Sequence, residues 1–202
     1  MKKNLIKETV CDVLTKEGEE IFRLTETLDY EQAAYVAEAI KNCSGTVVFS
    51  ACGTSAQAAR KSAHTLCCIG CPALFIPPSD ALHGGLGIIR ENDLLILISK
   101  GGCTREINQM IEPARKTGAV VIMVTENEEG SWAKKCDGIL TIRVSREPDP
   151  FNMLATSSTL AVIAAFDAIT IWLMKEKEYT KDNFARIHPE GEVGKRLAEE
   201  ES

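Results

Sequence analysis

Residues 46–55 read TVVFSACGTS, and the segment AQAARKSAHTL continues directly from Ser55. An apolar run rich in β-branched residues is typical of a strand, and the change at Gly53, Thr54 and Ser55 to a helix-like pattern marks its end. This order predicts a strand, a tight turn and a helix. Free backbone N–H groups at a helix start, next to two hydroxyls, favour an anion there. The same residue types also cap ordinary loops, so both interpretations of the turn stay open.

The pattern returns in residues 93–107, DLLILISKGGCTREI. A buried strand is followed by Ser99, Gly101, Gly102 and Thr104, and then by a second helix. The carboxyl ends of neighbouring parallel strands meet at one edge of a sheet, where α/β proteins bind their ligands. The two turns together therefore predict one phosphate pocket, although each alone could be a plain loop.

A third hydroxyl cluster, Thr156, Ser157 and Ser158, opens a long apolar helix, LAVIAAFDAITIWLMKEK. The cluster is another candidate N-terminus for binding an anion, and a simple N-cap is the alternative. The helix carries little charge before Lys175. We therefore expect it to be buried, with a subunit interface as one place for it.

The rest of the chain alternates regularly between apolar strands and amphipathic helices. Apolar spacing predicts helices over 3–27 and 30–42. Strands are expected over 46–50, 73–76, 93–98, 119–124 and 139–142, with helices between them over 55–69, 104–117 and 130–136. Strands without polar alternation have both faces covered, which predicts an α/β fold with a doubly wound parallel sheet. We expect a single domain overall, in which residues 1–45 form a helical segment packed on residues 46–202.

Composition excludes several classes of function. The chain has 202 residues, of which 45% are hydrophobic and 26% charged, as in an ordinary soluble globule. A net charge of −6 argues against a general nucleic-acid binder. No apolar run approaches the length needed to span a bilayer, so we expect no membrane partner. The N-terminus is basic but lacks an apolar signal core, which predicts a cytoplasmic protein.

The eight cysteines include one tight cluster, Cys67, Cys68 and Cys71. No second group of Cys or His accompanies it, so buried free thiols are favoured over zinc. We expect no metal and no cofactor.

Six segments of the chain resemble a known family. They are GTSAQAARK (53–61), HGGLGII (83–89), ISKGGCTREI (98–107), VTENEEGSWAKKCD (124–137), LATSSTLA (154–161) and DNFARIHPEGEVGKRL (182–197). From the first strand to Leu197, the chain resembles the sugar isomerase (SIS) domain of the arabinose-5-phosphate isomerase type. The resemblance implies a five-stranded parallel sheet, a phosphosugar ligand, and a homo-oligomer (tetramer or dimer) with active sites at subunit interfaces. Longer members continue into a regulatory pair of cystathionine-β-synthase-type domains, and we expect this chain to lack that module.

Several positions depart from the family pattern. Family isomerases carry a lysine where this chain has Thr54, and a glutamate where it has Cys103. A family serine is replaced by Gly101, and a family aspartate by Gly85. Losing a lysine and a glutamate together can keep the charge balance while changing which hydroxyls are recognised.

Other family positions are retained. Glu147 matches a family glutamate, His188 the histidine of a His-Pro motif, and His83 a histidine near the sugar. Aldose–ketose isomerisation needs a base that moves a carbon-bound proton, and an acid–base group for ring opening. The resemblance assigns these catalytic roles to Glu147, as a carboxylate with a raised pKa, and to His188, as a neutral imidazole. The expected substrate-binding residues are Gly53, Thr54, Ser55, His83, Ser99, Gly102, Thr104, Thr156, Ser157 and Ser158.

Each assignment has a structural alternative. Glu147 could be a solvated loop acid, and His188 a capping or core histidine. Lys100 could contact phosphate or be solvated. Glu106 reads as a favourable acid in a first helical turn, and both it and Glu126 are fallback candidates for the base.

Two functions therefore stay open. The first is a phosphosugar isomerase that acts through an enediol, and the second is a non-catalytic phosphosugar-binding sensor. A transcription factor is disfavoured because the segment before the first strand lacks a basic recognition helix.

Overall fold

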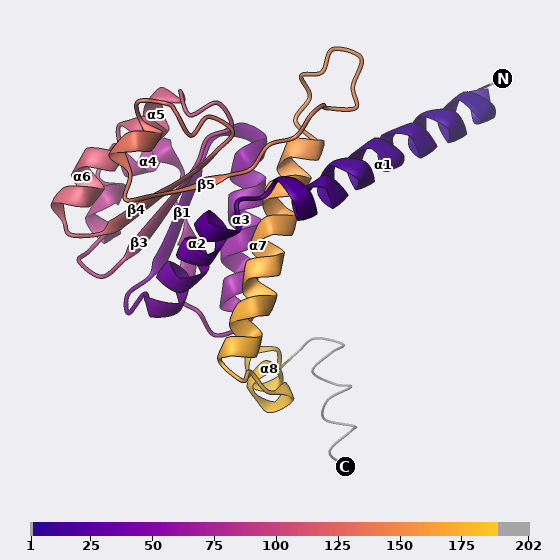
Figure 1. Cartoon of the computed structure of the whole chain (residues 1–202). Helices are drawn as coiled ribbons and strands as arrows, with labels where there is room; N and C mark the ends of the chain where they lie inside the picture. The colour runs from indigo at the N-terminus through magenta and orange to yellow at the C-terminus, as the bar shows by residue number, and fades with distance from the viewer. Residues whose placement is uncertain (1, 190–202) are drawn as a thin grey trace.

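The computed structural model describes residues 2–189. Five parallel strands form one sheet in the order β2-β1-β3-β4-β5 (Figure 1). The strands are β1 (Val47–Ala51), β2 (Ala73–Phe75), β3 (Leu94–Ile98), β4 (Val120–Thr125) and β5 (Gly138–Thr141). Each lies within one residue of its expected bounds, and the predicted doubly wound parallel sheet is confirmed.

Helices and short helical turns connect the strands. They are α1 (Lys2–Thr27), α2 (Tyr30–Asn42), α3 (Gly53–Cys67), α4 (Pro78–Ala81), α5 (Arg105–Asn108), α6 (Ile111–Lys116), α7 (Ser157–Glu176), α8 (Lys181–Ile187) and the 3₁₀ turns η1 (Gly85–Ile88) and η2 (Ala133–Lys135). Helices α2, α3 and α7 cover one face of the sheet, and α4 to α6 lie on the other (Figure 1).

The strands are apolar throughout because each face of the sheet has its own core. Phe49 and Ile96 are fully buried on the α3/α7 face, where Phe49 meets Phe166 edge to face at 5.2 Å. Their strand neighbours Val48 and Leu95 are buried on the opposite face. Burial of alternate residues on both sides removes any polar alternation from the sequence.

Two expected helices differ from the structure. The helix predicted over 104–117 is broken into α5 and α6, because Pro113 has no N–H for the carbonyl of Gln109 and its ring would clash with it. The helix predicted over 130–136 was wrong, since only the single turn η2 forms there. The N–H of Cys136 donates to the carbonyl of Ala133 in a 3₁₀ bond, and the chain then enters β5 at Gly138.

Helix α7 corrects the expectation that no apolar run reaches membrane-spanning length. Its 20 residues are long and apolar enough by composition, with a mean hydropathy of 1.7 in the most apolar stretch. In the fold it packs against α1, α2 and α3, and Ala161, Phe166 and Leu173 are buried. It is therefore the central core helix of this face.

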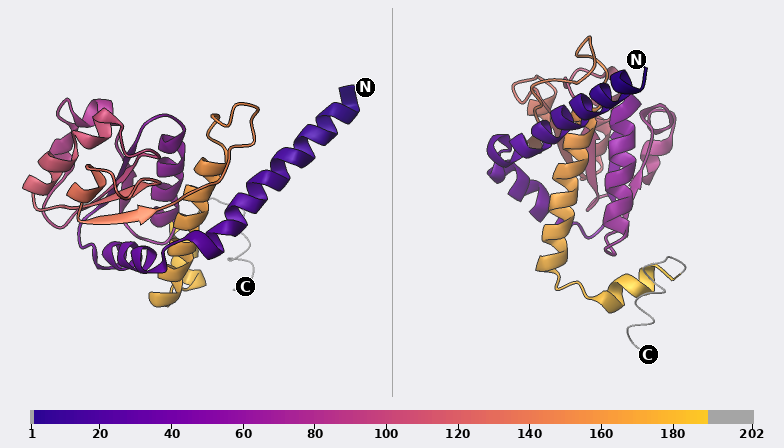
Figure 2. Two further views of the ribbon diagram at one scale, coloured as in Figure 1. Left: turned by 45° about the horizontal axis from the view of Figure 1, so that its top comes forward. Right: turned by 90° about the vertical axis from the view of Figure 1, so that its right-hand side faces the viewer.

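Helix α1 packs on α7 only through its C-terminal part, where Leu24 is buried. Its N-terminal part extends away from the other elements (Figures 1 and 2). This part leaves Leu5, Ile6 and Leu14 more than half exposed.

Candidate functional site

The turn after β1 is built by glycine. Gly53 has φ +58°, a left-handed conformation that other residues rarely adopt, and α3 begins there. Thr54 is exposed in the first turn of the helix, and Ser55 is half-buried. The predicted strand–turn–helix therefore presents an open helix start at the carboxyl edge of the sheet.

The turn after β3 is closed by its own side chains. Gly102 has φ +68°, and its N–H donates to the carbonyl of Ser99 at 2.9 Å. The hydroxyls of Ser99 and Thr104 lie 3.0 Å apart, and Asn108 Nδ2 donates to the carbonyl of Gly102 at 3.2 Å. This second hydroxyl loop is thus a fixed structure at the end of the neighbouring strand.

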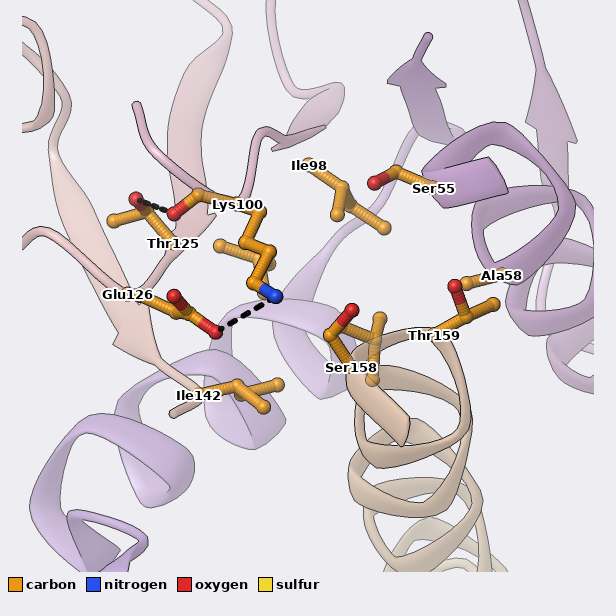
Figure 3. A pocket seen from close by; sticks show the side chains of 11 residues that line it. Ser55, Ala58, Ile98, Lys100, Thr125, Glu126, Ile142, Ser158 and Thr159 are labelled. Carbon is orange, nitrogen blue, oxygen red and sulfur yellow. Dashed lines mark hydrogen bonds and ion pairs between the residues drawn. The ribbon is translucent and has the colours of Figure 1, made fainter. Parts of the chain in front are cut away.

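A small cavity lies between these turns and the start of α7 (Figure 3). Its volume of about 20 Å³ has room for roughly one water molecule, so a larger ligand would bind across its opening. Ser55, Lys100, Glu126 and Ser158 converge on it from four different segments (Figure 3). The other lining residues are Ala58, Ile98, Val124, Thr125, Ile142, Thr159 and Val162.

Glu147 is buried beside this cavity, not solvated. Lys100 Nζ donates to its Oε1 at 2.9 Å, and the N–H of Thr156 donates to its Oε2 at 2.9 Å. The hydroxyl of Ser158 donates to Oε1 as well. Burial alone would raise the pKa of Glu147, but these hydrogen bonds outweigh burial and lower it. The expected raised pKa was wrong, and the carboxylate is ionised at neutral pH.

Glu126 has the opposite environment. Its Oε1 lies 3.7 Å from Lys100 Nζ, is buried, and accepts no hydrogen bond within residues 2–189. Burial is the largest influence on this carboxyl and raises the pKa of Glu126 despite the nearby ammonium. One lysine therefore lies between two carboxyl groups whose pKa values are displaced in opposite directions.

Unpaired polar atoms gather at this edge of the sheet. In the described part of the chain, the buried side-chain oxygens without a hydrogen-bond partner are Asn108 Oδ1, Glu126 Oε1, Thr156 Oγ1 and Ser157 Oγ. They belong to the end of α5, to the turn after β4 and to the start of α7. Buried polar groups are nearly always paired, so this cluster is suited to a polar ligand.

A family profile described as the SIS domain matches residues 40–172. This chain belongs to the SIS domain family. Arabinose 5-phosphate isomerase KpsF of Escherichia coli is 37% identical over 189 residues, which make up 94% of this chain and 60% of the relative. The chain thus spans about 60% of the length of the curated relatives that it matches first.

Two solved structures share this SIS fold at high similarity. A candidate sugar-phosphate isomerase of Listeria monocytogenes is 46% identical with a TM-score of 0.91, covering 94% of this chain and 99% of its own. A protein of Escherichia coli CFT073 in complex with arabinose 5-phosphate is 29% identical with a TM-score of 0.88, covering 94% of this chain and 100% of its own.

Some of the remaining expected residues lie near Glu147, and others lie away from the cavity. Thr156 and Ser157 start α7 next to Glu147. His83 is exposed after α4 and does not line the cavity. His188 ends α8, where its ring stacks on Phe184 at 3.9 Å. Residues 190–197 of the last motif lie outside the described residues.

One chain does not bring His188 to Glu147. The carboxylate of Glu147 accepts from Thr156 at the N-terminal end of α7, whereas His188 follows α8. Figure 1 shows α8 beyond the C-terminal end of α7. The 20 residues of α7 separate them by about 30 Å. If both act in one site, two subunits must contribute.

The sequence singled out no partner for Lys100, which the structure pairs with Glu147. It also gave no reason to expect Thr159 or Val162 in the cavity wall. The position of Glu126 directly after a strand was the one signal for its place in the SIS pocket.

The eight cysteines are free thiols, including the half-buried Cys67 and Cys68 and the buried Cys71. Within residues 2–189, no three His, Cys, Asp or Glu side chains are grouped to hold a metal ion.

Proposed function

We propose that this SIS domain binds a phosphosugar and interconverts its aldose and ketose forms through an enediol. One observation carries the proposal: the ionised, buried Glu147 lies beside Lys100 and the free hydroxyls at the start of α7. KpsF is named an arabinose 5-phosphate isomerase, and the Escherichia coli CFT073 structure holds arabinose 5-phosphate. This sugar phosphate is therefore the first substrate to test.

The phosphate is expected at the carboxyl edge of the sheet. The helix start at Gly53 presents backbone N–H groups, and Ser55, Thr104 and Ser157 offer hydroxyls at the starts of α3, α5 and α7. Lys100 adds the one positive charge among the cavity-lining side chains. The sugar would then extend over the cavity toward Glu147.

Glu147 is the proposed base for the carbon-bound proton. A carboxylate that is ionised at neutral pH can take the proton from C2 of the aldose and return it to C1 of the enediol. The hydrogen bonds from Lys100 and Ser158 fix its direction. A phosphate that attracted Lys100 would weaken one of these bonds and make the carboxylate a stronger base.

His188 is proposed to open the sugar ring in the pocket of a neighbouring subunit. The length of α7 keeps it away from the pocket of its own chain, and its imidazole is half-buried rather than locked in a core. This requires a homo-oligomer, either a tetramer or a dimer. Light scattering that shows a monomer at micromolar concentration would contradict the assembly.

We also propose that the protein is soluble and cytoplasmic, and that it uses neither nucleic acid nor a membrane as a partner. The net charge of −6 and the packing of α7 within the fold support this.

The decisive experiment is proton exchange in D₂O. Wild-type protein is incubated with arabinose 5-phosphate, and deuterium at C1 or C2 is followed by NMR. Glu147→Gln should lower turnover at least about 10²-fold while phosphosugar affinity stays within a few-fold. Glu112→Gln, on the exposed side of α6, is the matched control and should behave as wild type.

A wild-type protein that shows no deuterium exchange would favour the phosphosugar-binding sensor. Tight phosphosugar binding without carbon-bound exchange over hours would contradict the isomerase and support a sensor. Exchange at the wild-type rate in Glu147→Gln would retain the isomerase and reject Glu147 as the base. His188→Asn should slow turnover less for an open-chain substrate than for one that must open its ring.

A further inference from the structure

Glu126 is fixed in the pocket by its backbone on both sides. Its N–H donates to the carbonyl of Lys100 at 2.8 Å, and its carbonyl accepts from Arg143 Nε at 3.0 Å. Thr125, the last residue of β4, donates its hydroxyl to the same Lys100 carbonyl at 2.9 Å. The end of β4 and the turn after β3 are therefore joined, and the Glu126 side chain points to the cavity (Figure 3).

The two carboxyl groups near Lys100 differ in their partners. Glu147 accepts from Lys100, from Ser158 and from the backbone of Thr156, so its charge is well compensated. Glu126 has fewer partners: Lys100 Nζ lies 3.7 Å from its Oε1, the backbone of Val144 also donates to its carboxyl, and the buried Oε1 accepts no hydrogen bond. A carboxyl for which burial outweighs its donors favours the protonated form, especially beside another carboxylate.

We propose that Glu126 is a second catalytic residue, which exchanges protons with the sugar oxygens while Glu147 moves the carbon-bound proton. This inference rests on the proposed isomerase function. Pairs of acids in opposed environments divide acid and base roles in this way. Glu126 lines the cavity that the sugar would cover, and its Oε1, which accepts no hydrogen bond, is ion-paired with the same lysine that holds Glu147.

The proposed step balances. Ionised Glu147 takes the proton of C2 as the C2–H bond breaks, a C1–C2 double bond forms, and protonated Glu126 gives its proton to O1. Glu126 then takes the proton of the O2 hydroxyl as the C2–O2 double bond forms, and Glu147 returns its proton to C1. Both residues finish in their starting forms, and no oxidant or reductant is needed.

Lys100 and Glu126 supply the charged groups that line the pocket. Positions 54 and 103 carry Thr54 and Cys103, which are neutral in the thiol form. The structure supplies a cation and an acid from other turns, Lys100 after β3 and Glu126 after β4. Glu126 is thus specific to this pocket and cannot be located from the charged positions of a family motif.

The pH profile tests the proton that Glu126 carries. In wild type, kcat/KM for arabinose 5-phosphate should fall at low pH as Glu147 is protonated, and at high pH as Glu126 loses its proton. Glu126→Gln should lower kcat about 10²-fold, leave KM within a few-fold, and abolish the high-pH fall of the remaining activity. Glu126→Asp should recover part of the rate. Glu129→Gln is the matched control and should behave as wild type, because the Glu129 side chain is 80% exposed and paired with Lys134.

A titration provides a readout without substrate. Carbon-13 NMR of labelled glutamate side chains, assigned with Glu126→Gln and Glu147→Gln, should show Glu126 titrating at higher pH than Glu147. The reverse order, or wild-type kcat and pH profile in Glu126→Gln, would overturn the inference while leaving the isomerase intact. A wild type that exchanges no carbon-bound proton with any phosphosugar would instead refute the proposed function.

Discussion

The carboxylate of Glu20, on α1, accepts a hydrogen bond of 2.7 Å from the backbone N–H of Ser145, two residues before Glu147. The Ser145 hydroxyl donates to the same carboxylate, and the Glu20 side chain is only 2% exposed. The C-terminal part of α1, which packs on α7, is thereby also attached to the segment that carries the proposed base.

Glu20→Ala should lower the free energy of unfolding by about 1–3 kcal/mol, because it removes the hydrogen bonds that Ser145 donates to a buried carboxylate. Turnover should fall as well, since the backbone before Glu147 loses its anchor. Urea denaturation and the exchange assay measure the two effects. Glu19→Ala is the control, because Glu19 is exposed and its ion pair with Arg146 lies at the surface. Equal losses in both variants would contradict this role of Glu20.

Gly102→Ala should destabilise the protein by about 1–2 kcal/mol, because a side chain is strained at φ +68°. The added Cβ would also lie 3.3 Å from Thr125 Oγ1. Gly101→Ala is the neighbouring control, with no atom within 4 Å of its added Cβ. Chemical denaturation should separate the two variants, and similar stabilities would show that the turn does not need a left-handed residue.

Glu128 should make folding stability depend on acid pH. Hydrogen bonds from Arg143, Thr141 and Gln32 lower the pKa of Glu128 from 4.5 to about 2. The stabilisation is complete above pH 4.5 and is lost as the pH falls toward 2. Since this side chain is 35% exposed, solvent screening limits the change to roughly 1 kcal/mol. Glu128→Gln should flatten the stability profile between these pH values, and Glu129→Gln should leave it unchanged.

The exposed apolar side of α1 should be covered by a second copy of the chain. Ile6→Asp combined with Leu14→Asp should lower the mass measured by light scattering, because both side chains are 63% exposed in one chain. Thr15→Asp, also exposed on α1, is the control. An unchanged mass in the double variant would place the subunit contact elsewhere.

The strands and the edge that holds the site could be predicted because their signals are local. Runs such as LLILI and VVIMV indicate burial on both faces, and the glycines at 53 and 102 mark where the chain must turn. Pro113 also explains the break between α5 and α6, although the continuous apolar spacing around it concealed that break.

The pairing within the site could not be predicted from spacing. Lys100 and Glu147 are 47 residues apart, and neither position carries a local sign of the other. The low pKa of Glu147 follows from donors on α7 and on the turn after β3, which only the folded chain assembles. Likewise, the separation of His188 from its own pocket depends on the direction of α7, and its spacing in the sequence does not show this.

Helix α7 sets both the distance and the angle between the turn that holds Glu147 and the helix α8 that ends at His188. Each residue inserted into a helix lengthens it by about 1.5 Å and rotates everything beyond it by about 100°. An insertion within Ser157–Glu176 would therefore swing α8 and His188 around the helix axis while the turn that holds Glu147 stayed in place. Changes of length that preserve the angular relation must come as about seven residues, close to two full turns. Surface loops can change in length with little effect, whereas an insertion in α7 must preserve the rotation of α8 about the helix axis.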